Sequence, residues 1–149
     1  MKNNQISADA LFIVTNILDI GWYLLRVGNR IAGEFDLTQQ QFVVLNEIVN
    51  KTVVNQKQLV DDLFFEKSNV SKIIKKLNTL KYIEVSKSRE DGRVTVINAT
   101  QKGKLIWNNC MEKFNTWNLG FVESLGGEEM KRIVNSIRAL KELKESKSE

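Results

Sequence analysis

The segment from Leu59 to Arg93 constrains the fold of this chain of 149 residues more than any other part. A short helix pattern, a lysine-rich amphipathic helix pattern and a β-hairpin pattern follow one another there without an interrupting linker. Residues 67–93 carry eight basic and three acidic side chains, a balance of +5, whereas the whole chain carries +4. Positive charge is therefore concentrated on one supersecondary unit, which is the footprint expected of a surface that attracts a phosphate backbone.

Two helix patterns separated by a short turn make up the first part of this segment. Asn55 followed by Gln58 has the spacing of a capping box and predicts a helix that ends at Leu63. Residues 64–66 predict a turn and residues 67–80 predict a second helix, which together give a helix-turn-helix. The apolar face of the second helix consists of Val70, Ile73, Ile74, Leu77 and Leu80. The opposite face consists of Ser68, Ser71, Lys72, Lys75 and Thr79.

A β-hairpin is predicted directly after the second helix. Apolar and polar residues alternate over residues 83–86. In the next run, Val94 and Val96 alternate with Thr95 and Ile97. Asp91-Gly92 between the two runs is a turn signal, because glycine tolerates positive φ. The tip also carries Lys87, Arg89 and Arg93. A helix-turn-helix followed by such a hairpin is a winged helix.

Long apolar helix patterns flank the winged helix on both sides. Residues 9–33 repeat apolar side chains at steps of three and four, and further apolar residues widen that face. Thr38 with Gln41 predicts a capping box for the next helix, and Thr52-Val53-Val54 predicts a short strand. Thr100 can cap a helix that runs to about Ser124. The last helix is expected to bury Met130, Ile133, Val134, Ile137 and Leu140. A small winged helix cannot cover so much apolar surface, so we expect the long helices to pack together in a homodimer.

The composition argues against most catalytic and metal-binding chemistry. The sequence has no histidine, which removes Ser-His-Asp and Cys-His nucleophiles and most zinc sites. Its single cysteine leaves no internal disulfide and fits a reducing cytoplasm. No apolar run is expected to reach the roughly 18 residues that a membrane span needs. We therefore expect a cytoplasmic protein that does not contact a membrane, is not an enzyme, and needs neither a cofactor nor a metal.

Four short segments match the pattern of a known family. They are Leu37-Thr38-Gln39-Gln40-Gln41-Phe42, Lys67-Ser68-Asn69-Val70-Ser71-Lys72, Asp91-Gly92-Arg93 and Ala99-Thr100-Gln101-Lys102-Gly103. In this order and spacing, the chain resembles the MarR family of bacterial transcriptional regulators over nearly its whole length. The resemblance implies a mainly α fold with a small β-hairpin, formed by a single domain over residues 1–149. The DNA-binding winged helix would occupy residues 36–99, and the dimerisation helices would occupy residues 8–34 and 100–145.

This resemblance implies a homodimeric regulator, expected to be a repressor, that binds double-stranded DNA at an inverted repeat. The residues expected to reach base edges are Ser68, Asn69, Ser71 and Lys72, which lie toward the start of the recognition helix. Lys75 and Lys76 lie further along and are expected to meet phosphates. The expected wing contacts are Lys87, Arg89, Asp91 and Arg93. By resemblance, Arg93 enters the minor groove while Asp91 braces its guanidinium.

Three alternatives remain open at the level of sequence. Members of this family often bind small aromatic anions or lipophilic compounds, so a small-molecule effector is a candidate partner and Trp22, Arg26 and Trp107 are candidate ligand contacts. An aromatic stripe at helical spacing is more often part of a core than of a ligand pocket. Cys110 could be an oxidation switch, although its place on an apolar helix face favours an inert, buried thiol. Finally, a winged helix can serve as a protein-interaction module instead of a DNA reader.

Overall fold

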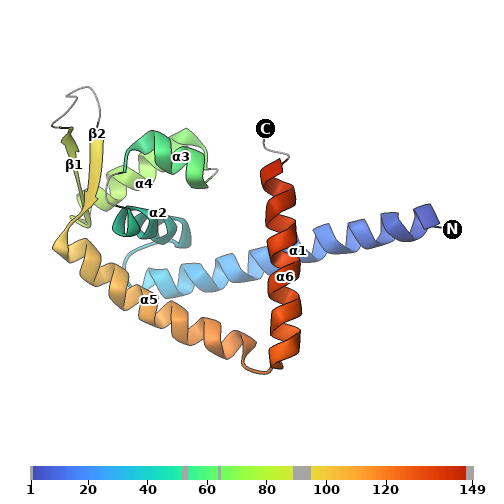
Figure 1. Cartoon of the computed structure of the whole chain (residues 1–149). Helices are drawn as coiled ribbons and strands as arrows, with labels where there is room; N and C mark the ends of the chain where they lie inside the picture. Colours follow the sequence, from blue (N-terminus) through green and yellow to red (C-terminus); the bar gives the residue numbers. More distant parts are fainter. Residues whose placement is uncertain (1, 52–53, 64, 89–94, 147–149) are drawn as a thin grey trace. The chain divides into compact units, whose positions relative to one another are not determined.

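The computed structural model describes residues 2–51, 54–63, 65–88 and 95–146, except for the side chains of residues 2 and 3. The elements in chain order are α1 (Lys2–Gly33), α2 (Gln39–Asn50), α3 (Gln56–Leu63), α4 (Lys67–Thr79), β1 (Ile83–Lys87), β2 (Thr95–Ala99), α5 (Gln101–Val122) and α6 (Gly127–Ser146) (Figure 1). The two strands form one antiparallel hairpin. This confirms the predicted fold class. The chain divides into two compact units, residues 1–113 and 114–149.

The core of the first unit lies where α2, α3 and α4 meet and pack against the hairpin (Figure 1). Leu45 of α2, Leu59 of α3 and Leu77 of α4 are all fully buried. The C-terminal end of α1 closes this core through its contact with α2, and Ala32 is fully buried there. The helix-turn-helix is therefore a packed scaffold that fixes the orientation of α4.

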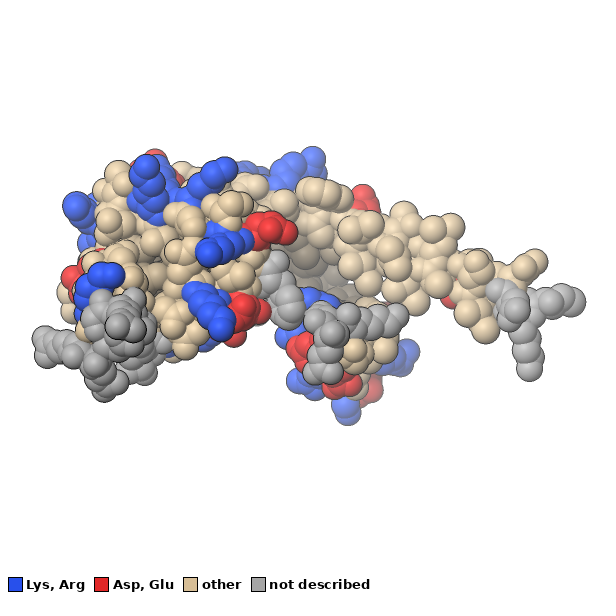
Figure 2. All heavy atoms as spheres, turned by 90° about the horizontal axis from the view of Figure 1, so that it is seen from above, with Lys and Arg blue, Asp and Glu red and all other residues tan. Residues whose placement is uncertain are grey.

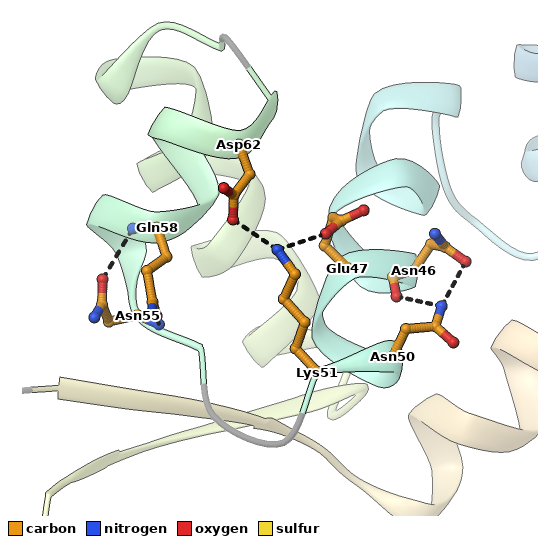
Figure 3. A network of polar contacts seen from close by, with 7 residues as sticks. All are labelled: Asn46, Glu47, Asn50, Lys51, Asn55, Gln58 and Asp62. Atoms are coloured by element: carbon orange, nitrogen blue, oxygen red, sulfur yellow. Dashed lines mark hydrogen bonds and ion pairs between the residues drawn. The ribbon is translucent and has the colours of Figure 1, made fainter.

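Reciprocal side-chain caps set the starts of α2 and α3, as predicted. The backbone N–H of Gln41 donates to Thr38 Oγ1 at 3.2 Å, and that of Thr38 donates to Gln41 Oε1 at 2.9 Å. Asn55 and Gln58 make the same pair of bonds, both at 2.9 Å (Figure 3). Each cap satisfies backbone donors that a helix start leaves without an intrahelical partner.

The start of α5 is held closely against the segment between α4 and β1. Thr100 Oγ1 donates to the carbonyl of Lys81 at 2.7 Å and accepts from the N–H of Gly103 at 3.0 Å. A Cβ atom at position 103 would lie 1.9 Å from the carbonyl oxygen of Tyr82. Glycine is required at this position because any side chain would collide with the backbone of Tyr82. Steric contact thus accounts for the Thr-x-x-Gly pattern seen in the sequence.

The hairpin follows the predicted order but differs in the phase of its second strand. Ile83 and Ile97 are its buried residues, and the N–H of Ile97 donates to the carbonyl of Val54 at 2.8 Å. Val96, predicted to take an alternating apolar position, is only half-buried. The reason is that the bridge to Val54 places Ile97 against the core. The predicted positions Thr52, Val53 and Val94 lie outside the described residues.

The first helix is longer and more exposed than the sequence pattern predicted. It begins at Lys2 rather than near residue 9, and it exposes large apolar side chains such as Leu11, Phe12 and Trp22, each 68% exposed. By length and composition alone, the stretch Asn4–Gly33 could cross a membrane. This corrects the expectation that no run is long and apolar enough. The mostly buried core helix of a soluble protein and a signal sequence near the N-terminus pass the same test.

The second unit contains the end of α5 and the whole of α6. The rings of Trp117 and Phe121 stack with centroids 5.0 Å apart. In α6 the residues predicted to be buried are exposed, including Ile133 at 42% and Ile137 at 53%, and Met130 is half-buried. Within a single copy of the chain, the prediction that these residues are buried is wrong, because no described residue of α6 is buried. The apolar periodicity of the helix is real, but the chain itself does not cover it.

Candidate nucleic-acid interface

The exposed face of α4 carries the polar residues that the sequence predicted there. Its exposed members are Ser68, Ser71, Lys72, Lys75, Lys76 and Thr79. Val70, Ile73 and Leu77 are buried on the opposite face. Glu66 stands at the N-cap but makes no side-chain hydrogen bond to the helix, so its carboxylate does not cap the first turn. The helix start and the lysine face are therefore both open to a partner.

No carboxylate among the described residues forms an ion pair with the lysines of this face. In the part of the chain that the structure describes, ion pairs involve Lys51 and Lys113 and none of the lysines of α4. Lys57 on α3 and Lys67 at the start of α4 are exposed as well and line one hollow together with Gln56. Blue lysine and arginine side chains gather over the lobe that holds α3 and α4 (Figure 2). Unpaired cations of this kind attract a polyanion.

Asn69 is half-buried and points back toward the protein. Its Nδ2 donates to Oε1 of Gln40, in the first turn of α2, at 3.2 Å. This bond ties the start of α4 to the start of α2. It leaves one amide hydrogen and Oδ1 for a further partner, so the predicted base contact stays a prediction.

Ser71 is exposed, but its hydroxyl group is already bonded on two sides. It donates to the carbonyl of Lys67 at 3.0 Å and accepts from Nε2 of Gln56 at 2.5 Å. Sequence reasoning missed both Gln56 and Gln40, because they lie 15 and 29 residues from the partners they bind. The available signal was their place in the first turns of capped helices that pack beside α4.

The wing is described only in part. Lys87 ends β1, opposite Thr95 of β2, and its side chain is exposed. Arg89, Asp91 and Arg93, together with the predicted Asp91-Gly92 turn, lie outside the described residues. The minor-groove contact of Arg93 stays a prediction.

A charged clamp joins the two helices that precede α4. Lys51 Nζ lies 2.9 Å from Glu47 Oε2 at the end of α2 and 2.6 Å from Asp62 Oδ2 of α3 (Figure 3). The hydrogen bond to Asp62, followed by that to Glu47, raises the pKa of Lys51. The three groups are partly exposed, so the clamp contributes little to stability. It connects the C-terminal end of α2 to α3.

The candidate ligand contacts do not share the described hollows. Trp22 is 68% exposed, and the Arg26 guanidinium lies 5.8 Å from the centre of the Tyr23 ring. Trp107 is half-buried and its indole N–H donates to Asn46 Oδ1 at 3.0 Å, so it anchors α5 to α2. Described residues form three hollows, and Trp22, Arg26 and Trp107 line none of these three. A binding role for them stays a prediction.

Cys110 is fully buried in α5. Burial, and to a smaller extent the negative charge of Glu34, raises the pKa of its thiol to about 12. The thiolate is the form that reacts with oxidants, so this environment suppresses oxidation. The structure supports the packing role that the sequence favoured.

A family model described as transcriptional regulator SarA/Rot matches residues 26–110, more than half of the chain. The chain belongs to the SarA/Rot family. Its matched region starts in α1, includes all of the helix-turn-helix and the hairpin, and ends at Cys110 in α5. The SarA/Rot chain is also 28% identical, over 109 residues, to the HTH-type transcriptional regulator SarZ of Staphylococcus aureus, covering 70% of each protein.

Solved structures share the fold of this SarA/Rot-family chain. The transcriptional regulator SlyA superposes with a TM-score of 0.80 at 20% identity, over 90% of this chain and 95% of its own. A MarR variant from E. coli in complex with operator DNA has a TM-score of 0.80 at 16% identity, over 89% and 95%. A MarR-family regulator from Listeria monocytogenes in complex with a 26mer DNA has a TM-score of 0.78 at 21% identity, over 87% and 86%. The predicted MarR-type winged helix is thereby confirmed.

Proposed function

We propose that this regulator binds double-stranded DNA by placing the exposed face of α4 in the major groove. The observation that carries the proposal is the row of exposed lysines on α4 that no described carboxylate pairs with. Lys72, Lys75 and Lys76 would meet phosphates or base edges, and the neutral polar residues nearby would read sequence. The MarR variant and the Listeria regulator of the same fold are each in a complex with DNA, which supports DNA binding by analogy.

The active species in this proposal is a homodimer. The N-terminal half of α1 and most of the apolar residues of α6 are exposed in the single chain, and Figure 2 shows that the surface of α1 beyond the charged lobe carries few charged side chains. A second copy that covers this surface would remove it from water, which favours association by roughly 25 cal/mol for each Å² of apolar surface buried. This explains the apolar character of α1 without a membrane. We accordingly place the protein in the cytoplasm.

Twofold symmetry determines the expected target. Two α4 helices related by a dimer axis reach successive major grooves on one side of the duplex, so the operator should be an inverted repeat. We infer repression, because a dimer that occupies two adjacent grooves excludes other proteins from an overlapping promoter. The chemistry expected of this protein is binding rather than catalysis, in line with the transcriptional regulators that it resembles.

Release by a small molecule is a secondary proposal. Trp22 is exposed and Arg26 lies over an aromatic ring, which supplies one cation beside aromatic surface for an aromatic carboxylate. Titration with benzoate, followed by tryptophan fluorescence and by duplex release, tests it. Fluorescence and duplex affinity that both stay constant would reject an effector of this class.

The test of the main proposal is selection from random duplex DNA. The purified protein is mixed with random double-stranded fragments, and the bound fragments are sequenced over several rounds. Enrichment of one inverted repeat supports the proposal. A variant with Lys72, Lys75 and Lys76 all changed to Glu is the matched control, and it should recover nothing. If the unaltered protein also enriches no sequence and retains no duplex, the winged helix is a protein-interaction module instead.

A further inference from the structure

Gln56, the first residue of α3, lies on the same surface as the exposed face of α4. Its Nε2 donates to Oγ of the exposed Ser71 at 2.5 Å, so its side chain crosses from α3 to α4. It lines two hollows of about 360 Å³ each, one with Lys57, Val60 and Lys67 and the other beside the hairpin. The side chain is only half-buried.

The hydrogen bonds at this pair leave a defined set of groups for a ligand. A serine hydroxyl has one donor and two acceptor sites, and that of Ser71 donates to Lys67 O and accepts from Gln56. It can therefore no longer donate to a base without breaking an existing bond. Gln56 uses one of its two amide hydrogens on Ser71. Its other amide hydrogen and its Oε1 have no partner among the described residues.

A glutamine with one free N–H and one free carbonyl oxygen on the same amide matches adenine. In the major groove adenine presents N7, an acceptor, next to the N6 amino group, a donor, and a glutamine amide can bind both at once. We propose that Gln56 reads one A·T base pair of the operator. Ser71 is the positioning residue that holds the amide at the correct angle.

This inference rests on the proposed function, since it concerns a base contact within the complex with duplex DNA. It assigns sequence reading to a residue of α3, outside the recognition helix. It also changes the role of Ser71, because loss of that hydroxyl would act through Gln56 and not through a base of its own. Two variants that act through one contact should not have additive effects.

The experiment uses the full chain and the duplex selected by the wild-type protein. Binding is measured with duplexes in which each base pair is changed in turn and with duplexes in which one adenine is replaced by 7-deazaadenine. The latter removes N7 and keeps base pairing. At one position of each half-site, wild type should lose roughly 5- to 150-fold in affinity upon either change. Gln56→Ala should show no preference at that position, and Ser71→Ala should show a reduced one.

Controls separate this reading from a structural effect. Lys57→Ala, beside Gln56, should weaken binding to all duplexes alike and keep the adenine preference. Adding Ser71→Ala to Gln56→Ala should not change the preference further. If Gln56→Ala keeps the full wild-type preference and the full sensitivity to 7-deazaadenine, the inference fails while DNA binding stands. If wild type binds no duplex at all, the proposed function fails and the inference fails with it.

Discussion

Individual lysines on α4 are expected to differ in what they contribute. A lysine that meets a phosphate displaces a bound counterion and adds affinity for every sequence, whereas a side chain at a base edge adds affinity for one sequence. Lys75 lies in the C-terminal half of α4, beyond the residues expected to reach base edges, and has no ion pair with a described residue. Its position favours the phosphate role.

Lys75→Ala should weaken binding to all duplexes by a similar factor. The slope of log affinity against log salt concentration should fall by about one, because one phosphate contact is lost. Fluorescence anisotropy over a salt series, with the selected duplex and a scrambled one, measures both quantities. An altered base preference with an unchanged slope would mean that Lys75 faces the bases.

Cys110 should be inert in the folded protein. With a pKa of about 12, roughly one thiol in ten thousand is ionised at pH 8, and the side chain is fully buried. Iodoacetamide should therefore modify Cys110 only after denaturation, as mass spectrometry can detect. The folded thiol has the higher pKa, so its stabilising contribution is lost as the pH rises above 9 towards 12. Rapid modification of the native protein at pH 8 would contradict this prediction and would support a role of Cys110 as an oxidation switch.

At this scale, the sequence predicted which residues lie on the exposed face of α4 but not what they bond to. Helical periodicity alone separates Ser71 and Lys72 from the buried Ile73. The bonds of Ser71 to Gln56 and of Asn69 to Gln40 depend on how separate helices pack. No local pattern encodes such a contact, so periodicity could not predict it.

The elements of the winged helix depend on close backbone contacts as well as on apolar burial. Among the described glycines, Gly103 makes the tightest of these contacts, since a Cβ there would lie 1.9 Å from the carbonyl oxygen of Tyr82. That contact fixes the junction of α4, β1 and α5. Lys102 strengthens it by donating to the carbonyl of Leu80 at 3.0 Å.

Gly103→Ala should destabilise the protein by about 1–3 kcal/mol, because the added methyl group forces α5 away from Tyr82. Gly120→Ala, in the same helix, is the matched control, since a Cβ there would meet no atom within 4 Å. It should leave stability unchanged or raise it by up to about 1 kcal/mol, because alanine favours helix over glycine. Urea unfolding followed by circular dichroism gives both values. Equal effects of the two substitutions would contradict the close contact.

The sequence predicted helices and strands best where the deciding hydrogen bonds join residues close together in the chain. The capping boxes at Thr38 and Asn55 involve residues three positions apart, and both were predicted correctly. The phase of β2 was not predicted correctly, because the burial of Ile97 depends on a bridge to Val54, more than forty residues earlier. Apolar alternation around Val96 could not reveal that partner.

At the scale of the whole molecule, the single chain leaves much apolar surface uncovered. Periodicity in α1 and α6 predicted buried faces, yet residues of those faces such as Val14 and Ile137 are exposed. An apolar face in a sequence shows that something covers it and does not identify the covering chain. The proposed homodimer supplies that cover.

Removal of residues 125–149 should abolish the dimer and with it tight operator binding, because the apolar face of α6 would be lost. Ile137→Glu tests the same point without truncation, and Ser136→Glu, on a neighbouring exposed position, is its control. Sedimentation velocity reports the association state of each protein. A stable, folded monomer of the intact protein would contradict the proposed assembly.

The most direct test of the central claim is the stoichiometry and salt dependence of binding to the selected duplex. Affinity is measured from 50 to about 300 mM salt for a duplex with the full inverted repeat and for one of equal length with a single half-site. The account predicts two copies of the chain on the full repeat, a linear fall of log affinity with log salt, and a shallower slope on the half-site. One copy bound per full repeat, or an affinity that does not depend on salt, would contradict it.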